Sequence, residues 1–163
     1  MEAKQSGEIM IPLDKYPHIP YWFTLRQAIV EMEKTELDIN GQKSTSNILL
    51  VFDKKYQLLG IVRQKDIIHG LDPEFLHGIS LRYKKRFNLN EIIKNIKEKA
   101  ERQVSDVMTF IKVAVDYEDS IIKALYEMIE NDISLIPVLK NKKVIGVVRI
   151  EDVFHEVANL ILR

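Results

Sequence analysis

The chain carries the stretch Gly60-Ile61-Val62-Arg63-Gln64-Lys65-Asp66 and repeats its pattern as Gly146-Val147-Val148-Arg149-Ile150-Glu151-Asp152. The likeness extends upstream of both stretches. The matched residues there are Ala28 with Ala124, Met32 with Met128, and Ile9-Met10 with Val107-Met108. A pattern that returns in the same order predicts one structural unit present twice.

Each copy is predicted to contain the same elements in the same order. A short extended piece comes first, and a helix follows it. Thr24 and Ser120 are the expected N-caps of these helices, because apolar residues at helical spacing follow both of them. Two apolar strands joined by a polar turn come next, and a second helix ends the unit. The predicted segments are extended pieces at 17–20 and 111–115, strands at 48–52, 58–62, 135–139 and 144–148, and second helices that begin near Asp66 and Asp152.

The predicted fold class is α/β, with two β-α-β-β-α repeats related by pseudo-twofold symmetry. We expect the two sheets to pack together, because a unit of about 60 residues buries little surface alone. The first repeat spans residues 1–70 and the second spans 104–163, and residues 71–103 connect them. The end of this connector, from 90 to 103, has the apolar spacing of an amphipathic helix. The first copy is longer because of a polar stretch at 38–46, which is predicted to be a loop.

The composition excludes several classes of protein. With 46% hydrophobic and 29% charged residues, the chain of 163 residues is an ordinary globular protein rather than a disordered one. The 24 basic and 24 acidic residues cancel, so no overall field attracts nucleic acid or an acidic membrane. A basic cluster with interleaved aromatic residues at 82–87 is interpreted as a solvated surface. No apolar run is long enough to span a membrane.

The residue types also argue against catalysis and metal binding. Cysteine is absent, which excludes disulfides and thiolate sites, and we expect the protein to be cytoplasmic. The four histidines are scattered and form no metal motif. The sequence contains no nucleophile elbow, phosphate-binding loop or zinc motif. The sequence therefore predicts that the protein is not an enzyme, with no catalytic or metal-binding residues.

The doubled unit resembles a tandem pair of cystathionine β-synthase (CBS) domains. The second copy is the closer match, and the first copy has Leu50 where the family often has the proline seen at Pro137. The residues that carry the resemblance are Val104-Ser105-Asp106-Val107-Met108-Thr109, Leu135-Ile136-Pro137-Val138, Val144-Ile145-Gly146-Val147-Val148 and Asp152. The resemblance implies a stand-alone regulatory sensor that binds adenine nucleotides or S-adenosylmethionine in a cleft between the repeats and pairs as a homodimer.

The family's nucleotide signature has Ser or Thr at the position that Arg63 and Arg149 occupy in this chain. An arginine side chain has no hydrogen-bond acceptor, so neither residue can cap the helix that follows. Two interpretations stay open. Each arginine reaches a ligand phosphate, or Arg63 pairs with Asp66 and Arg149 with Asp152 and the pairs close the sites.

The ligand-binding residues that the resemblance implies fall in both copies, and we favour the site of the second copy. Glycine is expected to let a ligand approach the end of the strand. The residues are Gly146, Val147, Arg149, Asp152, Ile133, Ser134, Leu135, Pro137, Thr109 and Ile111, together with Gly60, Arg63, Asp66 and Ile48.

The function predicted from the resemblance is a regulatory module without chemistry of its own. AMP, ADP, ATP or S-adenosylmethionine is the expected regulatory ligand, and no cofactor is required. The alternative is a structural dimerisation module whose ligand clefts are closed by the Arg–Asp pairs. The sequence does not identify the regulated protein partner.

Overall fold

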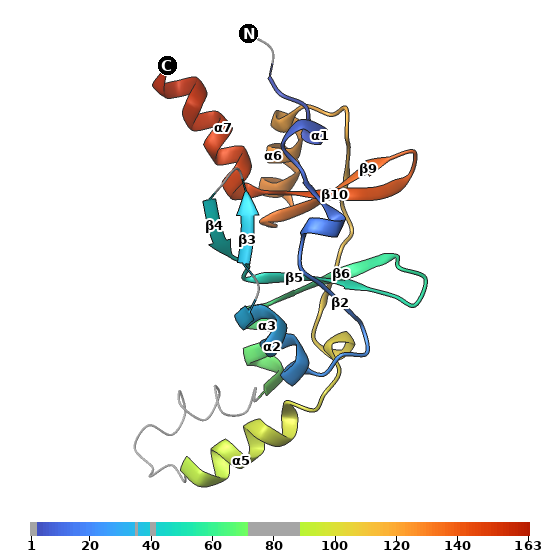
Figure 1. Cartoon of the computed structure of the whole chain (residues 1–163), viewed down its shortest axis with the longest axis vertical. Helices are drawn as coiled ribbons and strands as arrows, with labels where there is room; N and C mark the ends of the chain where they lie inside the picture. Colours follow the sequence, from blue (N-terminus) through green and yellow to red (C-terminus); the bar gives the residue numbers. More distant parts are fainter. Residues whose placement is uncertain (1–2, 35, 40–41, 72–88) are drawn as a thin grey trace. The chain divides into compact units, whose positions relative to one another are not determined.

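The computed structural model describes residues 3–34, 36–39, 42–71 and 89–163. The chain, traced in Figure 1, divides into two compact units. Unit 1 contains Met1–Tyr16 and Ile111–Arg163, and unit 2 contains Pro17–Phe110. Each unit is built around a four-stranded sheet, so the α/β fold class is confirmed.

The sheet of unit 1 has the strand order β1-β10-β9-β8. Strand β8 runs parallel to β9, and the other neighbours are antiparallel. The strands are β1 (Ile11–Pro12), β8 (Val115–Asp116), β9 (Leu135–Lys140) and β10 (Lys143–Arg149), and the helices are α1 (Ser6–Ile9), the 3-10 turn η1 (Leu13–Lys15), α6 (Ile121–Glu130) and α7 (Ile150–Leu162). The core of the unit consists of Val115, Ala124, Met128, Ile136, Val138, Val148 and Val153.

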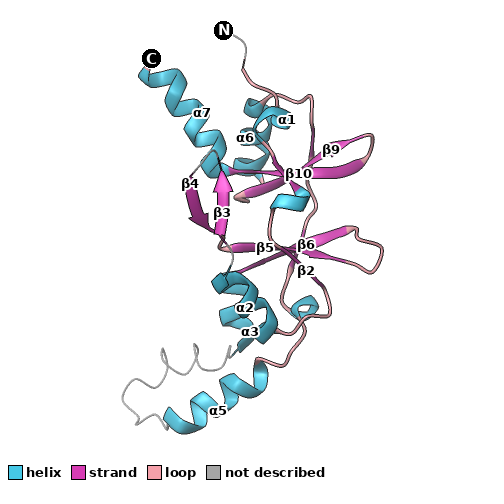
Figure 2. Ribbon diagram, viewed as in Figure 1, coloured by secondary structure: helices cyan, strands magenta, loops and turns pink. Residues whose placement is uncertain are grey.

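The sheet of unit 2 has the equivalent order β2-β5-β6-β7, with β2 parallel to β5. Figure 2 shows the hairpin strands β5 and β6 of this sheet, and β9 and β10 of the sheet of unit 1, in magenta. The strands are β2 (His18–Pro20), β5 (Ile48–Phe52), β6 (Leu58–Arg63) and β7 (Thr109–Phe110), and the helices are α2 (Leu25–Lys34), α3 (Gln64–Leu71), α5 (Leu89–Lys99) and the 3-10 turn η2 (Val104–Asp106). The core of the unit consists of Ile19, Leu25, Ala28, Met32, Leu49, Val51, Val62, Ile67 and Val104.

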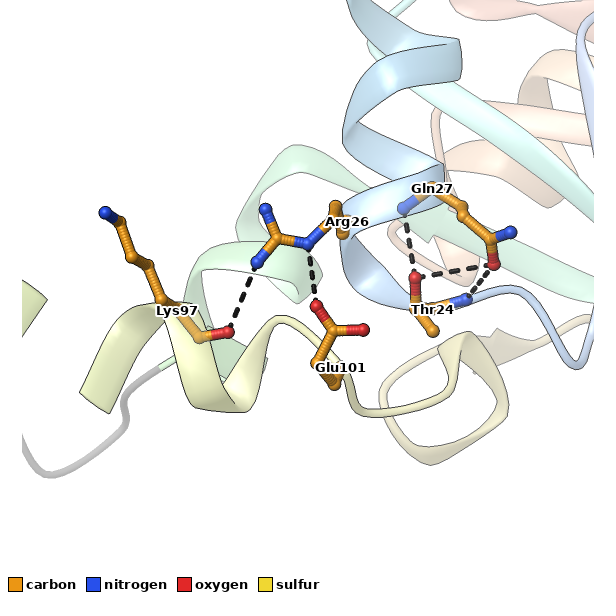
Figure 3. A network of polar contacts seen from close by, with 5 residues as sticks. All are labelled: Thr24, Arg26, Gln27, Lys97 and Glu101. Carbon is orange, nitrogen blue, oxygen red and sulfur yellow. Dashed lines mark hydrogen bonds and ion pairs between the residues drawn. The ribbon is translucent and has the colours of Figure 1, made fainter. Parts of the chain in front are cut away.

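The first helix of each repeat begins at the predicted cap. The Thr24 hydroxyl accepts a hydrogen bond from the Gln27 backbone N–H at 3.1 Å, and the Gln27 side-chain oxygen accepts one from the Thr24 backbone N–H at 2.9 Å (Figure 3). The Ser120 hydroxyl accepts one from the Lys123 backbone N–H at 3.3 Å. Both caps satisfy donors that the first helical turn leaves unpaired, so the predicted starts of α2 and α6 are confirmed.

The connector ends in the amphipathic helix that the sequence predicts. Helix α5 is held to α2 by Arg26, whose Nε lies 2.7 Å from Glu101 Oε1 and whose Nη2 donates to the Lys97 backbone oxygen at 3.4 Å (Figure 3). The preceding residues 72–88, which include the basic cluster at 82–87, lie outside the described part of the chain.

The polar stretch at 38–46, predicted to be a loop, contains strand structure instead. Strands β3 (Glu36–Ile39) and β4 (Gln42–Thr45) form a two-stranded antiparallel sheet in which Glu36 pairs with Thr45. The prediction was wrong because Gln42–Thr45 has no apolar residue, so alternating hydrophobicity gives no strand signal there.

The two repeats exchange their edge strands. Strand β7 lies at the start of the second repeat but completes the sheet of unit 2, with Phe110 opposite Gly60. Strand β1 lies in the first repeat but completes the sheet of unit 1, with Pro12 opposite Gly146. The compact units therefore differ from the contiguous segments 1–70 and 104–163, because residues 1–16 belong with the second repeat.

Candidate functional site

In unit 2, Arg63 and Asp66 form a bidentate ion pair where β6 ends and α3 begins. Arg63 Nε donates to Asp66 Oδ2 at 2.9 Å, and Arg63 Nη2 donates to Asp66 Oδ1 at 2.9 Å. The Arg63 backbone N–H also donates to Asp66 Oδ2 at 2.9 Å. Asp66 thus satisfies the Arg63 backbone donor at the start of α3, which is one of the two hydrogen bonds of a capping box. A hydroxyl at position 63 would accept the other bond, from the backbone N–H of residue 66.

In unit 1, Arg149 and Asp152 form the same kind of pair where β10 ends and α7 begins. Arg149 Nε donates to Asp152 Oδ2 at 3.0 Å, and Nη2 donates to Oδ1 at 2.9 Å. The hydrogen bonds that Arg149 donates to Asp152 raise the pKa of the Arg149 guanidinium above its ordinary value, and burial opposes this effect. The two Arg–Asp pairs, which one interpretation of the sequence predicted, are therefore present. That these pairs close the sites to a ligand stays a prediction.

Both pairs occupy the same place in their sheets. Arg63 lies opposite Ile48 in the β5–β6 ladder, and Arg149 lies opposite Leu135 in the β9–β10 ladder. The backbone of Ser134 is also near this corner, because its carbonyl oxygen accepts a hydrogen bond from the Ile150 N–H at 2.9 Å. The strand ends therefore place Ile48 beside Arg63 in unit 2. In unit 1 they place Ser134 and Leu135 beside Arg149.

Several predicted ligand-binding residues lie elsewhere. Pro137 and Val147 are buried opposite each other within the sheet of unit 1. Ile133 packs against the core of unit 1. Ile111 is half-buried just after β7.

Thr109 lies in unit 2, where it contacts Arg63. The sequence groups Thr109 with the second repeat, but its hydroxyl oxygen accepts a hydrogen bond from Arg63 Nη2 at 3.1 Å in unit 2. This contact follows from the strand exchange, because β7 brings Thr109 beside β6. The sequence held one signal of this exchange. Because Val107-Met108 matches Ile9-Met10, the next residues, Thr109 and Ile11, also match, and Ile11 lies on strand β1.

The two glycines of the repeated stretch have a structural task that sequence reasoning missed. A Cβ atom added to Gly60 would lie 2.3 Å from the Thr109 backbone oxygen. A Cβ atom added to Gly146 would lie 2.7 Å from the Ile11 backbone oxygen and 2.7 Å from Met10 Sδ. The space beside each glycine is thus occupied by the exchanged edge strand, whereas the sequence-based explanation assigned it to a ligand.

Two further observations concern metal binding and membrane insertion in the described residues. No three of their His, Asp and Glu side chains are grouped so that they could hold a metal ion. None of the helices in the described ranges has the length and apolar character of a membrane span.

Residues 104–159 match the family model of the CBS domain. The chain is similar to the CBS-pair protein CBSX2 from Arabidopsis thaliana, with 18% identity, coverage of 99% of both chains and a TM-score of 0.68. A structure of CBSX2 in complex with AMP matches with 22% identity, coverage of 98% of this chain and 99% of the other, and a TM-score of 0.64.

A third similar structure is the CBS domain of a CBS domain containing membrane protein from Sphaerobacter thermophilus. It has 21% identity and a TM-score of 0.67, and the alignment covers 94% of this chain and 87% of the other. None of the curated proteins matches the sequence. At these identities, the solved structures establish the fold that this chain shares with them.

Proposed function

From the premise that residues 104–159 belong to the CBS domain family and that the chain has the CBS-pair fold, we propose that this protein is a regulatory module that binds an adenosyl ligand. The ligand is an adenine nucleotide or S-adenosylmethionine, and the module catalyses no reaction of its own. The AMP complex of CBSX2, a protein of the same fold, supports this ligand class.

The observation that carries the proposal is the Arg–Asp pair at the end of the central hairpin in each unit. A guanidinium offers a planar fork of donors that suits phosphate oxygens. A carboxylate in the first turn of a helix can accept hydrogen bonds from ribose hydroxyls. The helix N-terminus adds a partial positive charge beside the phosphate. A nucleotide can therefore replace the contacts within the pair by contacts of the same kind.

The test is calorimetry and thermal unfolding with AMP, ADP, ATP and S-adenosylmethionine. A ligand that binds only the folded state at 100 times its Kd adds about 2.7 kcal/mol to the free energy of unfolding, which raises the Tm. We expect at least one of Asp66→Asn and Asp152→Asn to weaken binding. The control variant Glu130→Gln removes an exposed carboxylate at the end of α6 and should bind as the wild type does.

The competing function is a structural dimerisation module in which the Arg–Asp pairs serve only to hold the strand ends. The bidentate geometry of both pairs favours it. The two functions differ in one result. If no compound of the panel produces heat or changes the Tm, the ligand-binding proposal is contradicted and the structural module is supported.

Homodimerisation is the second part of the proposal, and it is supported by an exposed apolar face on unit 1. Helices α6 and α7 pack against each other and present large exposed apolar side chains. The α6 residues recur at helical spacing on one face. The balanced charge of the chain lets two copies approach without net repulsion. The residues are Ile122, Tyr126, Ile129, Phe154 and Ile161.

Light scattering after size-exclusion chromatography tests the dimer. We expect a dimeric mass for the wild type and a monomeric mass for the double variant Ile129→Glu and Phe154→Glu. Leu89→Glu, at the exposed start of α5, is the matched control and should stay dimeric. A monomeric wild type would contradict this part of the proposal.

A further inference from the structure

A hollow lies along one face of helix α5 in unit 2. Its volume is about 500 Å³, and its described lining residues belong to α5 and to the turn that follows it. They recur three or four residues apart, so they share one side of the helix. At about 1.5 Å per residue, the lined stretch is about 17 Å long, or about three helical turns. The residues are Asn90, Ile93, Lys94, Lys97, Glu98 and Glu101.

The hollow offers apolar surface to a partner. Ile93 lines it and is 42% exposed, and Leu89, one turn earlier on the helix, is 65% exposed. Helix α5 packs against α3, yet none of the residues of α5 is buried. A partner that covers Leu89 and Ile93 therefore removes apolar area from water, which favours binding.

The charges of the hollow are positive on balance. Lys94 and Lys97 are exposed, and in the described part of the chain neither ammonium group forms an ion pair. Glu101 lies 2.7 Å from Arg26, so its charge is balanced within the chain. The two lysines outweigh the remaining carboxylate, that of Glu98, and the hollow has one net positive charge at neutral pH.

The C-terminal end of α5 is held in place by hydrogen bonds. The Arg26 backbone N–H donates to the Ala100 oxygen at 2.9 Å, and Arg26 Nη2 donates to the Lys97 oxygen (Figure 3). Arg102 Nη1 donates to the Gly70 backbone oxygen at 3.0 Å, in the last turn of α3. These bonds tie the end of α5 to both α2 and α3. A surface that is ordered before binding loses less entropy when a partner docks.

We propose that this face of α5 docks an amphipathic helix of the regulated protein, one with acidic residues beside its apolar stripe. An elongated hollow with apolar surface and flanking lysines matches the helix-in-groove mode of recognition. Opposite charge on the partner favours this association, and like charge opposes it. A flat lipid surface does not fill a hollow, and the balanced charge of the whole chain gives no attraction to an acidic membrane. The inference rests on the proposed function and deepens it, because it names the kind of protein that the module regulates.

The test is fluorescence anisotropy with two labelled helical peptides and no adenosyl ligand. Both peptides have leucine at positions i, i+3 and i+7, and they differ in having glutamate or lysine beside the leucines. We expect the glutamate peptide to bind the wild-type chain at least about tenfold more tightly than the lysine peptide. Its affinity should fall as salt rises, because exposed charges are screened. Ile93→Asp should weaken its binding, because the apolar contact is lost.

Charge reversal supplies the decisive comparison. The double variant Lys94→Glu and Lys97→Glu changes two exposed side chains, and we expect it to prefer the lysine peptide. The double variant Lys94→Gln and Lys97→Gln adds no repulsion between carboxylates and should lose the preference for the glutamate peptide. The matched control, Lys54→Glu with Lys55→Glu, alters the exposed hairpin turn of the same unit and should bind as the wild type does. A thermal scan checks that each variant is folded.

Two results would overturn the inference. In one, the glutamate peptide does not bind the wild type, and in the other it binds the wild type and the charge-reversed chain equally. The adenosyl panel tests the proposed function separately. Binding of an adenosyl ligand without binding of the peptide contradicts only the docking surface, whereas binding of the peptide without any ligand response contradicts the ligand-binding proposal.

Discussion

Replacing Gly60 by alanine tests the role of the exchanged edge strand. The new Cβ atom would lie 2.3 Å from the Thr109 backbone oxygen, 3.1 Å from its carbonyl carbon and 3.2 Å from the Phe110 Cα. All three neighbours are backbone atoms, so no side chain can rotate to relieve the contact. Strand β7 must therefore shift away from β6, and Thr109 moves with it.

The cost follows from two opposing effects. Overpacking of a closely fitted site costs about 1–3 kcal/mol, and the upper part of this range applies because the backbone itself must move. Alanine also reduces the freedom of the unfolded chain, which returns about 0.4–1 kcal/mol. The net loss is about 2 kcal/mol in the free energy of unfolding, which lowers the Tm of a chain of this size by roughly 4–8 °C.

Circular dichroism during heating measures this loss. The control is Gln57→Ala, an exposed position in the turn just before β6, whose Tm should stay close to that of the wild type. Gly146→Ala should cost less than Gly60→Ala, because one of its two nearest atoms is the flexible Met10 Sδ. If Gly60→Ala melts at the wild-type temperature, the edge strand does not need the glycine and the argument is refuted.

Three further predictions concern stability. Ser120→Ala should lower the free energy of unfolding by about 1 kcal/mol in urea titrations, because the hydroxyl caps α6; an unchanged midpoint would contradict this. Met128→Ala should cost about 2–5 kcal/mol in the same assay, since the side chain is fully buried in the core of unit 1, and a loss below 1 kcal/mol would show that the cavity collapses. The Asp116 backbone N–H, which donates to Asp119 Oδ2 at 2.8 Å, holds the pKa of Asp119 below its ordinary value, and Lys123 adds to this effect. Asp119 therefore stabilises the fold above its unfolded pKa of about 3.9, and this contribution is lost as the pH falls through the lower folded value. Between pH 5 and pH 2 the stability of Asp119→Asn should fall less than that of the wild type, and parallel pH profiles would count against the assignment.

The hairpin strands could be predicted from the sequence almost to the residue. The predicted strands at 58–62 and 135–139 correspond to Leu58–Arg63 and Leu135–Lys140. This success has a local cause, because a continuous apolar run bounded by a polar turn specifies a buried strand with little help from the rest of the chain. The caps at Thr24 and Ser120 could be predicted because they are also local: each hydroxyl bonds a backbone N–H only three residues later.

The edge strands could not be predicted, because nothing local specifies them. Strands β1 and β7 are two residues long, too short for any periodicity to appear. Their pairing depends on glycines far away in the sequence, which leave room for the approaching backbone. The contact between Thr109 and Arg63 depends in turn on that pairing, so this part of the candidate site is a product of tertiary structure alone.

The geometry around Asp66 shows why an Arg–Asp pair is compatible with a binding site. Asp66 Oδ2 accepts hydrogen bonds both from the Arg63 backbone N–H and from Arg63 Nε. If the guanidinium turns toward a phosphate, the backbone bond can persist and the start of α3 stays satisfied. The other carboxylate oxygen, Oδ1, is then released from Arg63 Nη2 and can accept a hydrogen bond from a ribose hydroxyl. The pair can therefore open toward a nucleotide without unwinding the helix. If the contacts between the two side chains alone held the start of α3, opening the pair would unwind it.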